Sequence, residues 1–198
     1  PTRRSSDLLP WPEVEKLFPA YALRAGAAIA RTRGRVLEVG CGIGNMTRHI
    51  AQRPEVQSVL AVDGFASATA EIESLALPKV NVQTAAADGL ALPQDRQFDT
   101  VVMCEFIEHL YPDEELRLLE ALRPHLAPGA GWVVSVPVGW LEDPHHVRAF
   151  SPAAFARHLH KHYGTVQGRD DRSGYAQVAW GAGWVVSVPV GWLEDPHH

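Results

Sequence analysis

The sequence predicts an α/β fold in which helices cover both faces of an open, mostly parallel sheet, a doubly wound arrangement. Short apolar runs, such as residues 36–39 and 58–63, alternate along the chain with stretches of helical character. A run of alternate glycines follows the first of these apolar runs, and Asp63 closes the second. Because strand ends and the turns after them line the ligand crevice of such a sheet, both features are expected at one site.

The totals are those of an ordinary globular domain. At 198 residues the chain has the length of one domain with at most a small appendage, and 46% of its residues are hydrophobic. The formal net charge of −5 argues against a nucleic-acid surface. No stretch is apolar enough to span a membrane, and the first residues lack the apolar segment of a signal peptide. The two cysteines, Cys41 and Cys104, indicate no disulfide framework, so we expect a reducing, cytoplasmic location.

The expected elements follow one another in regular alternation. Pro12 and the acids after it predict an N-terminal helix that Pro19 interrupts and that ends near Ala30. The expected strands are residues 36–39, 58–63, 80–84, 98–104 and 132–137, followed by 163–168 and 175–180 as an antiparallel pair. The expected helices between them are residues 45–53, 66–76, 113–125 and 152–162, the last of which begins at the N-cap Ser151.

The glycine-rich turn within residues 35–47 is the stretch around which the chain is organised. Gly40, Gly42 and Gly44 stand at alternate positions, and Glu38 is the one charge inside the apolar run before them. Glycine lets the backbone approach a ligand where a Cβ would obstruct it. Dinucleotide-binding turns space their glycines as G-x-G-x-x-G, whereas this run is G-x-G-x-G, which indicates another ligand.

The segment Glu38-x-Gly40-x-Gly42-x-Gly44 resembles motif I of the class I S-adenosylmethionine (SAM)-dependent methyltransferases. The resemblance covers roughly residues 35–155 and also includes the Asp63 strand end, Asp88 and the segment 98–110. It implies a Rossmann-like, seven-stranded sheet of order 3-2-1-4-5-7-6. It also implies a SAM-binding methyltransferase domain over residues 35–180, preceded by an N-terminal helical cap over residues 1–34.

The resemblance further implies which residues bind the cofactor. Glu38 would act on the SAM ammonium, and Asp63 would accept both ribose hydroxyls, although a helix-capping role for Asp63 is the alternative. Gly64 and Phe65 would bracket the adenine, and Asp88 would accept from its amino group. The complete expected set is Glu38, Gly40, Cys41, Gly42, Gly44, Asp63, Gly64, Phe65, Asp88, Gly89 and Cys104.

Three polar residues, Glu105, Glu108 and His109, follow the fourth strand. They stand at i, i+3 and i+4, so they share one face of a helical turn. Small-molecule methyltransferases, including ubiquinone-pathway O-methyltransferases, carry a similar Glu-x-x-Glu-His, which implies His109 as a base at the acceptor and Glu105 and Glu108 as its catalytic neighbours. The small-RNA 3′-end 2′-O-methyltransferases bind a divalent metal through such a segment and a later histidine, here His146. Glu105, Glu108, His109 and His146 are therefore the candidate ligands for Mg²⁺ or Mn²⁺.

The function expected from these features is methyl transfer from SAM to a small-molecule O or N acceptor. The acidic charge, the short chain and the lack of a basic patch disfavour RNA and, with it, a metal. The alternatives are a metal-dependent RNA 3′-end 2′-O-methyltransferase and a catalytically inactive SAM-fold binding subunit. No membrane partner is expected.

The end of the chain repeats an earlier part of it. Residues 181–198 are identical, letter for letter, to residues 129–146. Natural structural repeats diverge and occur in arrays of several units, so this copy indicates a recent duplication, an artefact of cloning or assembly, or an engineered addition. Because the predicted domain is complete at Trp180, the copy is expected to lie outside the core.

Overall fold

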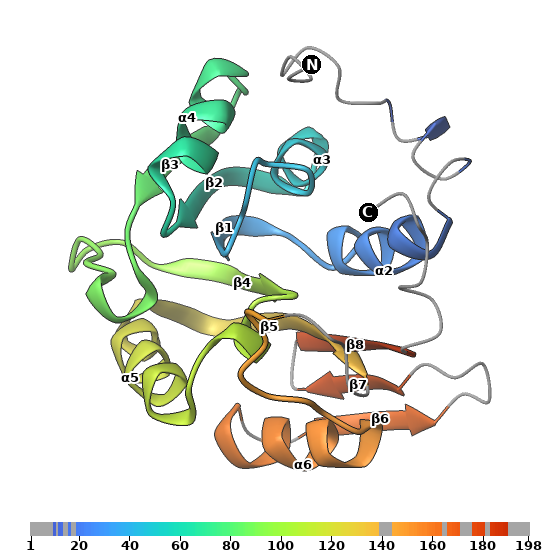
Figure 1. Ribbon diagram of the computed structural model, residues 1–198. Helices are drawn as coiled ribbons and strands as arrows, with labels where there is room; N and C mark the ends of the chain where they lie inside the picture. Colours follow the sequence, from blue (N-terminus) through green and yellow to red (C-terminus); the bar gives the residue numbers. More distant parts are fainter. Residues whose placement is uncertain are drawn as a thin grey trace.

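A computed structural model shows an α/β sandwich with one central sheet (Figure 1). The structure describes residues 10, 12–13, 16, 19–138, 144–163, 166–170, 176–180 and 183–189. Most of the predicted N-terminal cap, residues 1–34, therefore lies outside the described residues up to residue 18, and helix α2 (Pro19–Ile29) is its described part. This helix begins at the proline that was expected to interrupt it.

The first five strands form the predicted parallel sheet. They are β1 (Gly34–Val39), β2 (Val56–Asp63), β3 (Val80–Thr84), β4 (Phe98–Cys104) and β5 (Leu126–Val138). Their order is β3-β2-β1-β4-β5, and every neighbouring pair is parallel. The chain reverses its direction of winding at β1, so the carboxyl ends of β1 and β4 flank the crevice of a doubly wound sheet.

The far half of the sheet differs from the prediction, because the sheet has eight strands instead of seven. Strands β6 (Val166–Asp170) and β7 (Ala176–Trp180) pair antiparallel, as expected. Strand β8 (Gly183–Pro189), which belongs to the repeated tail, lies between β5 and β7, parallel to β5 and antiparallel to β7. Its sequence is suited to a strand wherever a slot beside β5 is open, since it is the sequence of β5 itself. The two copies pair one position out of step, with Trp184 opposite Val133.

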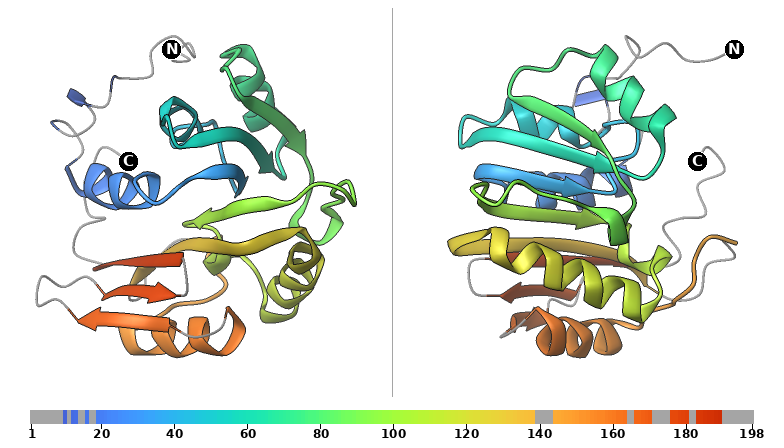
Figure 2. Two further views of the ribbon diagram at one scale, coloured as in Figure 1. Left: turned by 180° about the vertical axis from the view of Figure 1, so that it is seen from behind. Right: turned by 90° about the vertical axis from the view of Figure 1, so that its left-hand side faces the viewer.

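Two helical layers cover the sheet (Figure 2). Alternate residues of each strand point to opposite faces, so each strand supplies two cores. One core joins Leu37, Met103 and Val134 to α5 (Pro112–Leu122) and α6 (Pro152–His162). The other joins Val36 and Val102 to α2 and α3 (Thr47–Gln52), while α4 (Ala66–Ser74) covers β2 and β3 on the same side.

Shorter elements complete the chain. The helical turns η2 (Ala87–Gly89), η3 (Ile107–His109) and η4 (Arg123–His125) follow β3, β4 and α5. The predicted cap of α6 is present, because the backbone N–H of Ala154 donates to Ser151 Oγ at 3.2 Å. Within the described part of the chain, no helix has both the length and the hydrophobicity needed to cross a membrane.

Candidate active site

A cavity of about 600 Å³ opens at the carboxyl ends of β1, β2 and β4. Of the expected cofactor residues, Gly40, Gly42, Asp63, Gly64 and Phe65 line it. Glu105 and His109, expected on the acceptor side, line the same cavity. Its volume is within the usual range of small-molecule sites, about 300–1,000 Å³. The topology therefore brings predicted cofactor residues and predicted acceptor-side residues to one cavity.

The three glycines of the turn after β1 have different reasons to be glycine. All have positive φ, +75° at Gly40, +52° at Gly42 and +86° at Gly44, a conformation that L side chains rarely adopt. A Cβ on Gly40 would lie 2.3 Å from the ring of Phe106, and one on Gly44 would lie 2.8 Å from Ile72. A Cβ on Gly42 would meet nothing within 4 Å, so only at Gly42 does the turn border open space.

Asp63, at the end of β2, holds this turn in place. Its Oδ2 accepts from the backbone N–H of Gly42 at 2.8 Å, and its Oδ1 accepts from the N–H of Phe65 at 3.0 Å. Each carboxylate oxygen has a second lone pair, so the side chain can accept further hydrogen bonds from a ligand. The next residues, Gly64 and Phe65, also line the cavity, and Phe65 is 76% exposed.

Glu38 lies deeper than the turn. It is 4% exposed and is not among the described residues that line the cavity. Burial raises the pKa of its carboxyl to about 7, against a smaller lowering effect of Thr47. Among the described residues, its Oε2 has no hydrogen-bond partner. A buried carboxylate oxygen of this kind is a strong acceptor for a cationic donor.

The remaining expected cofactor residues are not among the described residues that line the cavity. Cys41 is buried beside β2, and this burial raises the pKa of its thiol, so it is a neutral thiol at pH 7. Cys104 is half-buried at the end of β4, and no disulfide joins it to Cys41. Gly89 is exposed in η2. Asp88 lies in the same turn, and its side chain is outside what the structure describes.

The turn after β4 presents the acceptor-side residues. Glu105 has a positive φ of +51°, and its Oε1 accepts from Ser135 Oγ at 2.8 Å. His109 Nδ1 lies 3.0 Å from the backbone oxygen of His145. A carbonyl oxygen only accepts, so the neutral imidazole carries its hydrogen on Nδ1 and has its lone pair on Nε2. His145 also lines the cavity and was not predicted, although the His-His pair at 145–146 was visible in the sequence.

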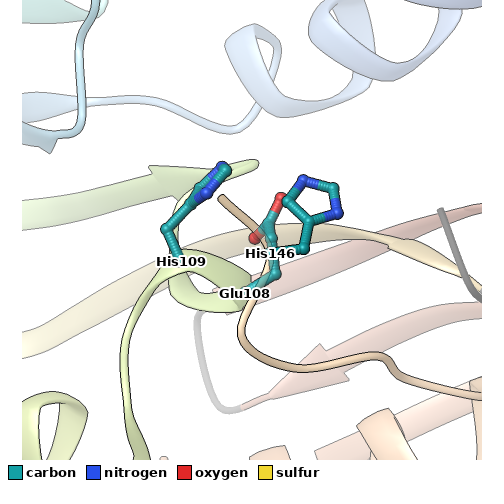
Figure 3. Close-up of side chains that lie close together, drawn as sticks. All are labelled: Glu108, His109 and His146. Carbon is teal, nitrogen blue, oxygen red and sulfur yellow. The ribbon is translucent and has the colours of Figure 1, made fainter. Parts of the chain in front are cut away.

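Three of the four candidate metal ligands come together. One ligand atom each of Glu108, His109 and His146 lies within 4.8 Å of the others. Figure 3 shows that the three side chains lie close together. Glu108 and His109 belong to η3, and His146 comes from the segment before α6, where its ring centroid lies 4.7 Å from that of His109. Glu105 is not part of this group.

The sequence did not predict a buried network that joins α5 to α6 and to the segment before α6. Glu115, on α5, is 1% exposed, and its carboxylate accepts from Arg148 Nη1 at 2.7 Å, His158 Nε2 at 2.9 Å and Tyr163 Oη at 2.6 Å. Although burial opposes it, the combined effect of these partners, His158 first, lowers the pKa of Glu115 to about 2. Acidic residues in the first turn of a helix are so common that Glu115 carried no signal.

Arg148 links this network to the turn that carries His109. Its Nη2 donates to the backbone oxygen of Ile107, and the backbone N–H groups of Val147 and Arg148 donate to the oxygen of Glu108 at 3.0 and 3.3 Å. The segment before α6 is thus fastened along η3. This contact sets the position of His145 and His146 relative to His109.

Comparison with known proteins identifies curated relatives of this chain. N-methyltransferase 4 of Papaver somniferum is 28% identical over 100 residues, which make up 48% of this chain and 28% of that protein. Trans-aconitate 2-methyltransferase of Deinococcus radiodurans is 28% identical over 160 residues, or 78% of this chain and 60% of that protein. The chain thus spans less than two thirds of the length of either relative.

Solved structures show the same fold. The DhpI-SAH complex is 25% identical, with a TM-score of 0.57 over 84% of this chain and 83% of that one. The small RNA methyltransferase HEN1 is 15% identical, with a TM-score of 0.64 over 76% of this chain and 22% of that one, a likeness of fold alone. The complexes of such neighbours support SAM as the cofactor of this chain. The family model described as a methyltransferase domain matches residues 13–186, and this chain therefore belongs to that family of methyltransferase domains.

Proposed function

We propose that this chain moves a methyl group from SAM to an O or N atom of a small-molecule acceptor. The observation that carries this proposal is the shared cavity. The glycine turn and Asp63 line one part of it, and Glu105 and His109 line another. A cofactor held by the first group therefore has its acceptor beside the second group, which aligns the two reactants.

The residues at the turn fit SAM. The open space at Gly42 leaves room for a ligand close to the backbone, and the buried Oε2 of Glu38 offers an acceptor to an ammonium group. Asp63 has lone pairs left for ribose hydroxyls, and the exposed ring of Phe65 offers a surface for a purine. The proposed set remains Glu38, Gly40, Cys41, Gly42, Gly44, Asp63, Gly64, Phe65, Asp88, Gly89 and Cys104.

On the acceptor side, His109 is the proposed base. When bound, SAM supplies an electrophilic methyl group on a sulfonium. Nε2 of His109 holds the lone pair that takes a proton from the acceptor, since Nδ1 is oriented by the oxygen of His145. Glu105 lines the cavity next to it, and Glu108 is buried in the same turn.

Isothermal titration calorimetry with SAM tests the cofactor half of the proposal. Asp63→Ala removes the acceptors of the Gly42 N–H and of the ribose, and is expected to weaken SAM binding by about 1–3 kcal/mol, roughly 5- to 150-fold. Asp95→Ala, an exposed acid outside the site, is the matched control and leaves the affinity unchanged. Equal affinities of the two variants would contradict the role of Asp63. An absence of SAM binding by the wild type would favour the inactive binding subunit instead.

The convergence of Glu108, His109 and His146 supports a second candidate, a metal-dependent RNA 3′-end 2′-O-methyltransferase. One carboxylate and two imidazoles form a donor set suited to a divalent transition metal, with Glu105 as the remaining candidate ligand. Methylation of an RNA 3′ end that is lost with a chelator and restored by Mn²⁺ would establish this alternative. Chelator-resistant methylation of a small molecule would exclude it.

The proposed organisation of the chain is a cap at residues 1–34, a methyltransferase domain at 35–180 and an added copy at 181–198. Strand β8 is parallel to β5 and antiparallel to β7. Without β8, strand β7 can pair antiparallel with β5 without changing its direction. That rearrangement gives the seven-stranded order 3-2-1-4-5-7-6, which the sequence predicts for the domain alone.

A further inference from the structure

We infer that the ring of Phe106 binds the positively charged sulfonium of SAM and fixes the position from which its methyl group is transferred. This inference rests on the proposed function and adds to its site a residue that the sequence did not single out. It is carried by the place of Phe106 between two turns at the cavity, residues 40–44 (the cofactor turn) and residues 105–109 (the acceptor turn).

The ring of Phe106 joins the two turns. Phe106 belongs to the acceptor turn, as the N-cap of η3, and it lines the cavity. Its ring lies against the cofactor turn, because a Cβ on Gly40 would come within 2.3 Å of Cδ2 and 2.9 Å of Cγ of this ring. A side chain at position 40 would therefore collide with the ring, so the glycine there makes room for Phe106 as well as for the turn.

Methyl transfer brings its reacting atoms to this junction. In the proposed function, Gly42 and Asp63 lie on the cofactor side of the cavity and His109 lies on the acceptor side. Transfer requires the methyl group to point from the cofactor towards the acceptor, near contact with both. The sulfur that carries the methyl group therefore lies where the two turns meet, beside the ring of Phe106.

The position of Phe106 is fixed by its own neighbours. Its backbone oxygen accepts from the N–H of His109 at 3.1 Å. Its half-buried side chain packs against the hydrophobic core that contains Met103 and Leu110. A ring that is already ordered loses little conformational freedom when a ligand binds, so more of the attraction appears as affinity.

An aromatic ring is suited to a sulfonium. This cation has no N–H or O–H group, so it cannot donate a conventional hydrogen bond to the protein. The face of an aromatic ring carries negative potential and attracts such cations, as in the recognition of quaternary ammonium groups. The attraction is worth roughly two- to thirtyfold in affinity, depending on how far water is excluded.

S-adenosylhomocysteine (SAH) separates the charge from the rest of the ligand. It shares the adenosine and amino-acid parts of SAM, but its sulfur is neutral, because the electrons of the C–S bond stay on sulfur when the methyl group leaves. A loss of packing around the ring weakens both ligands alike. A loss of attraction to the positive charge weakens SAM alone, so it lowers the ratio of the Kd for SAH to the Kd for SAM.

Isothermal titration calorimetry of the full chain with SAM and with SAH measures this ratio. Phe106→Leu keeps an apolar side chain but removes the ring, and is expected to lower the ratio by about threefold or more. Replacement of Phe106 by pentafluorophenylalanine keeps an aromatic ring for packing but withdraws the negative charge from its face, and is expected to lower the ratio as well. Phe65→Leu, which removes the other ring on the cavity wall, is the matched control and is expected to leave the ratio unchanged.

The two replacements of Phe106 keep the test decisive even if Phe106→Leu does not fold. An unchanged ratio in the pentafluorophenylalanine variant would overturn the inference and leave Phe106 with a role in packing. An equal fall of the ratio in Phe65→Leu and Phe106→Leu would also overturn it. A wild type that binds neither SAM nor SAH would instead remove the proposed function itself.

Discussion

The buried carboxylate of Glu115 provides the sharpest test of how the structure holds its acceptor side. Three donors converge on this one side chain, from the segment before α6, from α6 itself and from the residue that follows it. Glu115→Gln keeps the shape but replaces a charge acceptor by an amide, whose N–H₂ group then faces donors. A buried donor left without an acceptor costs free energy in addition to the lost charge interaction.

The expected loss of unfolding free energy in Glu115→Gln follows from the pKa of Glu115. A fall from 4.5 to about 2 corresponds to roughly 3 kcal/mol at about 1.4 kcal/mol per pKa unit, and the side chain is 2% exposed, so solvent screening is small. The pKa is lowered, so the stabilisation is complete above pH 4.5 and is lost as the pH falls towards 2. We therefore expect Glu115→Gln to lose about 3 kcal/mol of unfolding free energy at pH 7, and only about 2 kcal/mol at pH 3.5.

Urea unfolding of the wild type and the variant at both pH values measures this difference. Glu120→Gln, an exposed acid on the same helix, is the matched control and is expected to change stability by less than about 0.5 kcal/mol. A Glu115→Gln variant as stable as this control at pH 7, or a gap that widens as the pH falls, would refute the reasoning.

The remaining predictions concern the cofactor turn, the buried acid of β1 and the tail. Gly42→Val and Gly40→Val share the strain of positive φ, but only a Cβ on Gly40 would collide with a ring. Circular dichroism should therefore find Gly42→Val folded and Gly40→Val unfolded. Calorimetry should find that Gly42→Val does not bind SAM. Burial raises the pKa of Glu38 to about 7, so wild-type stability falls between pH 4.5 and 7. Glu38→Gln should remove that fall, be up to about 3 kcal/mol more stable than the wild type at pH 8 in urea, and bind SAM more weakly. Deletion of residues 181–198 should leave the melting temperature and SAM binding unchanged, whereas a large drop in melting temperature would make β8 an integral strand.

The local pattern of residues was sufficient to predict the elements and the cofactor side of the cavity. Alternation of apolar runs with helical stretches marked the five parallel strands, and Ser151 marked where α6 begins. The glycine turn and Asp63 were found because their chemistry is local: a positive φ and a strand end are features of a few consecutive residues. The order of the parallel strands followed because this pattern resembles a known family.

Contacts between distant segments were not visible in this way. The sequence placed Glu105 and His146 in one group, whereas the structure separates Glu105, which Ser135 holds, from the cluster around His109. Glu115 and Arg148 are 33 positions apart, and nothing in their own neighbourhoods marks either of them as buried. Only packing of α5 and α6 on the same face of the sheet brings them together.

The repeated tail shows most plainly what the local sequence determines and what only the tertiary structure decides. By itself, the sequence determined that residues 183–189 have the pattern of a strand, because the period of side chains along a segment is local. It could not determine where that strand pairs, because two identical segments present the same pattern to every partner. Tertiary structure decided that β8 lies beside β5 with a one-position offset, since hydrogen bonding between strands depends on which backbone edge is open and not on the letters of the strand.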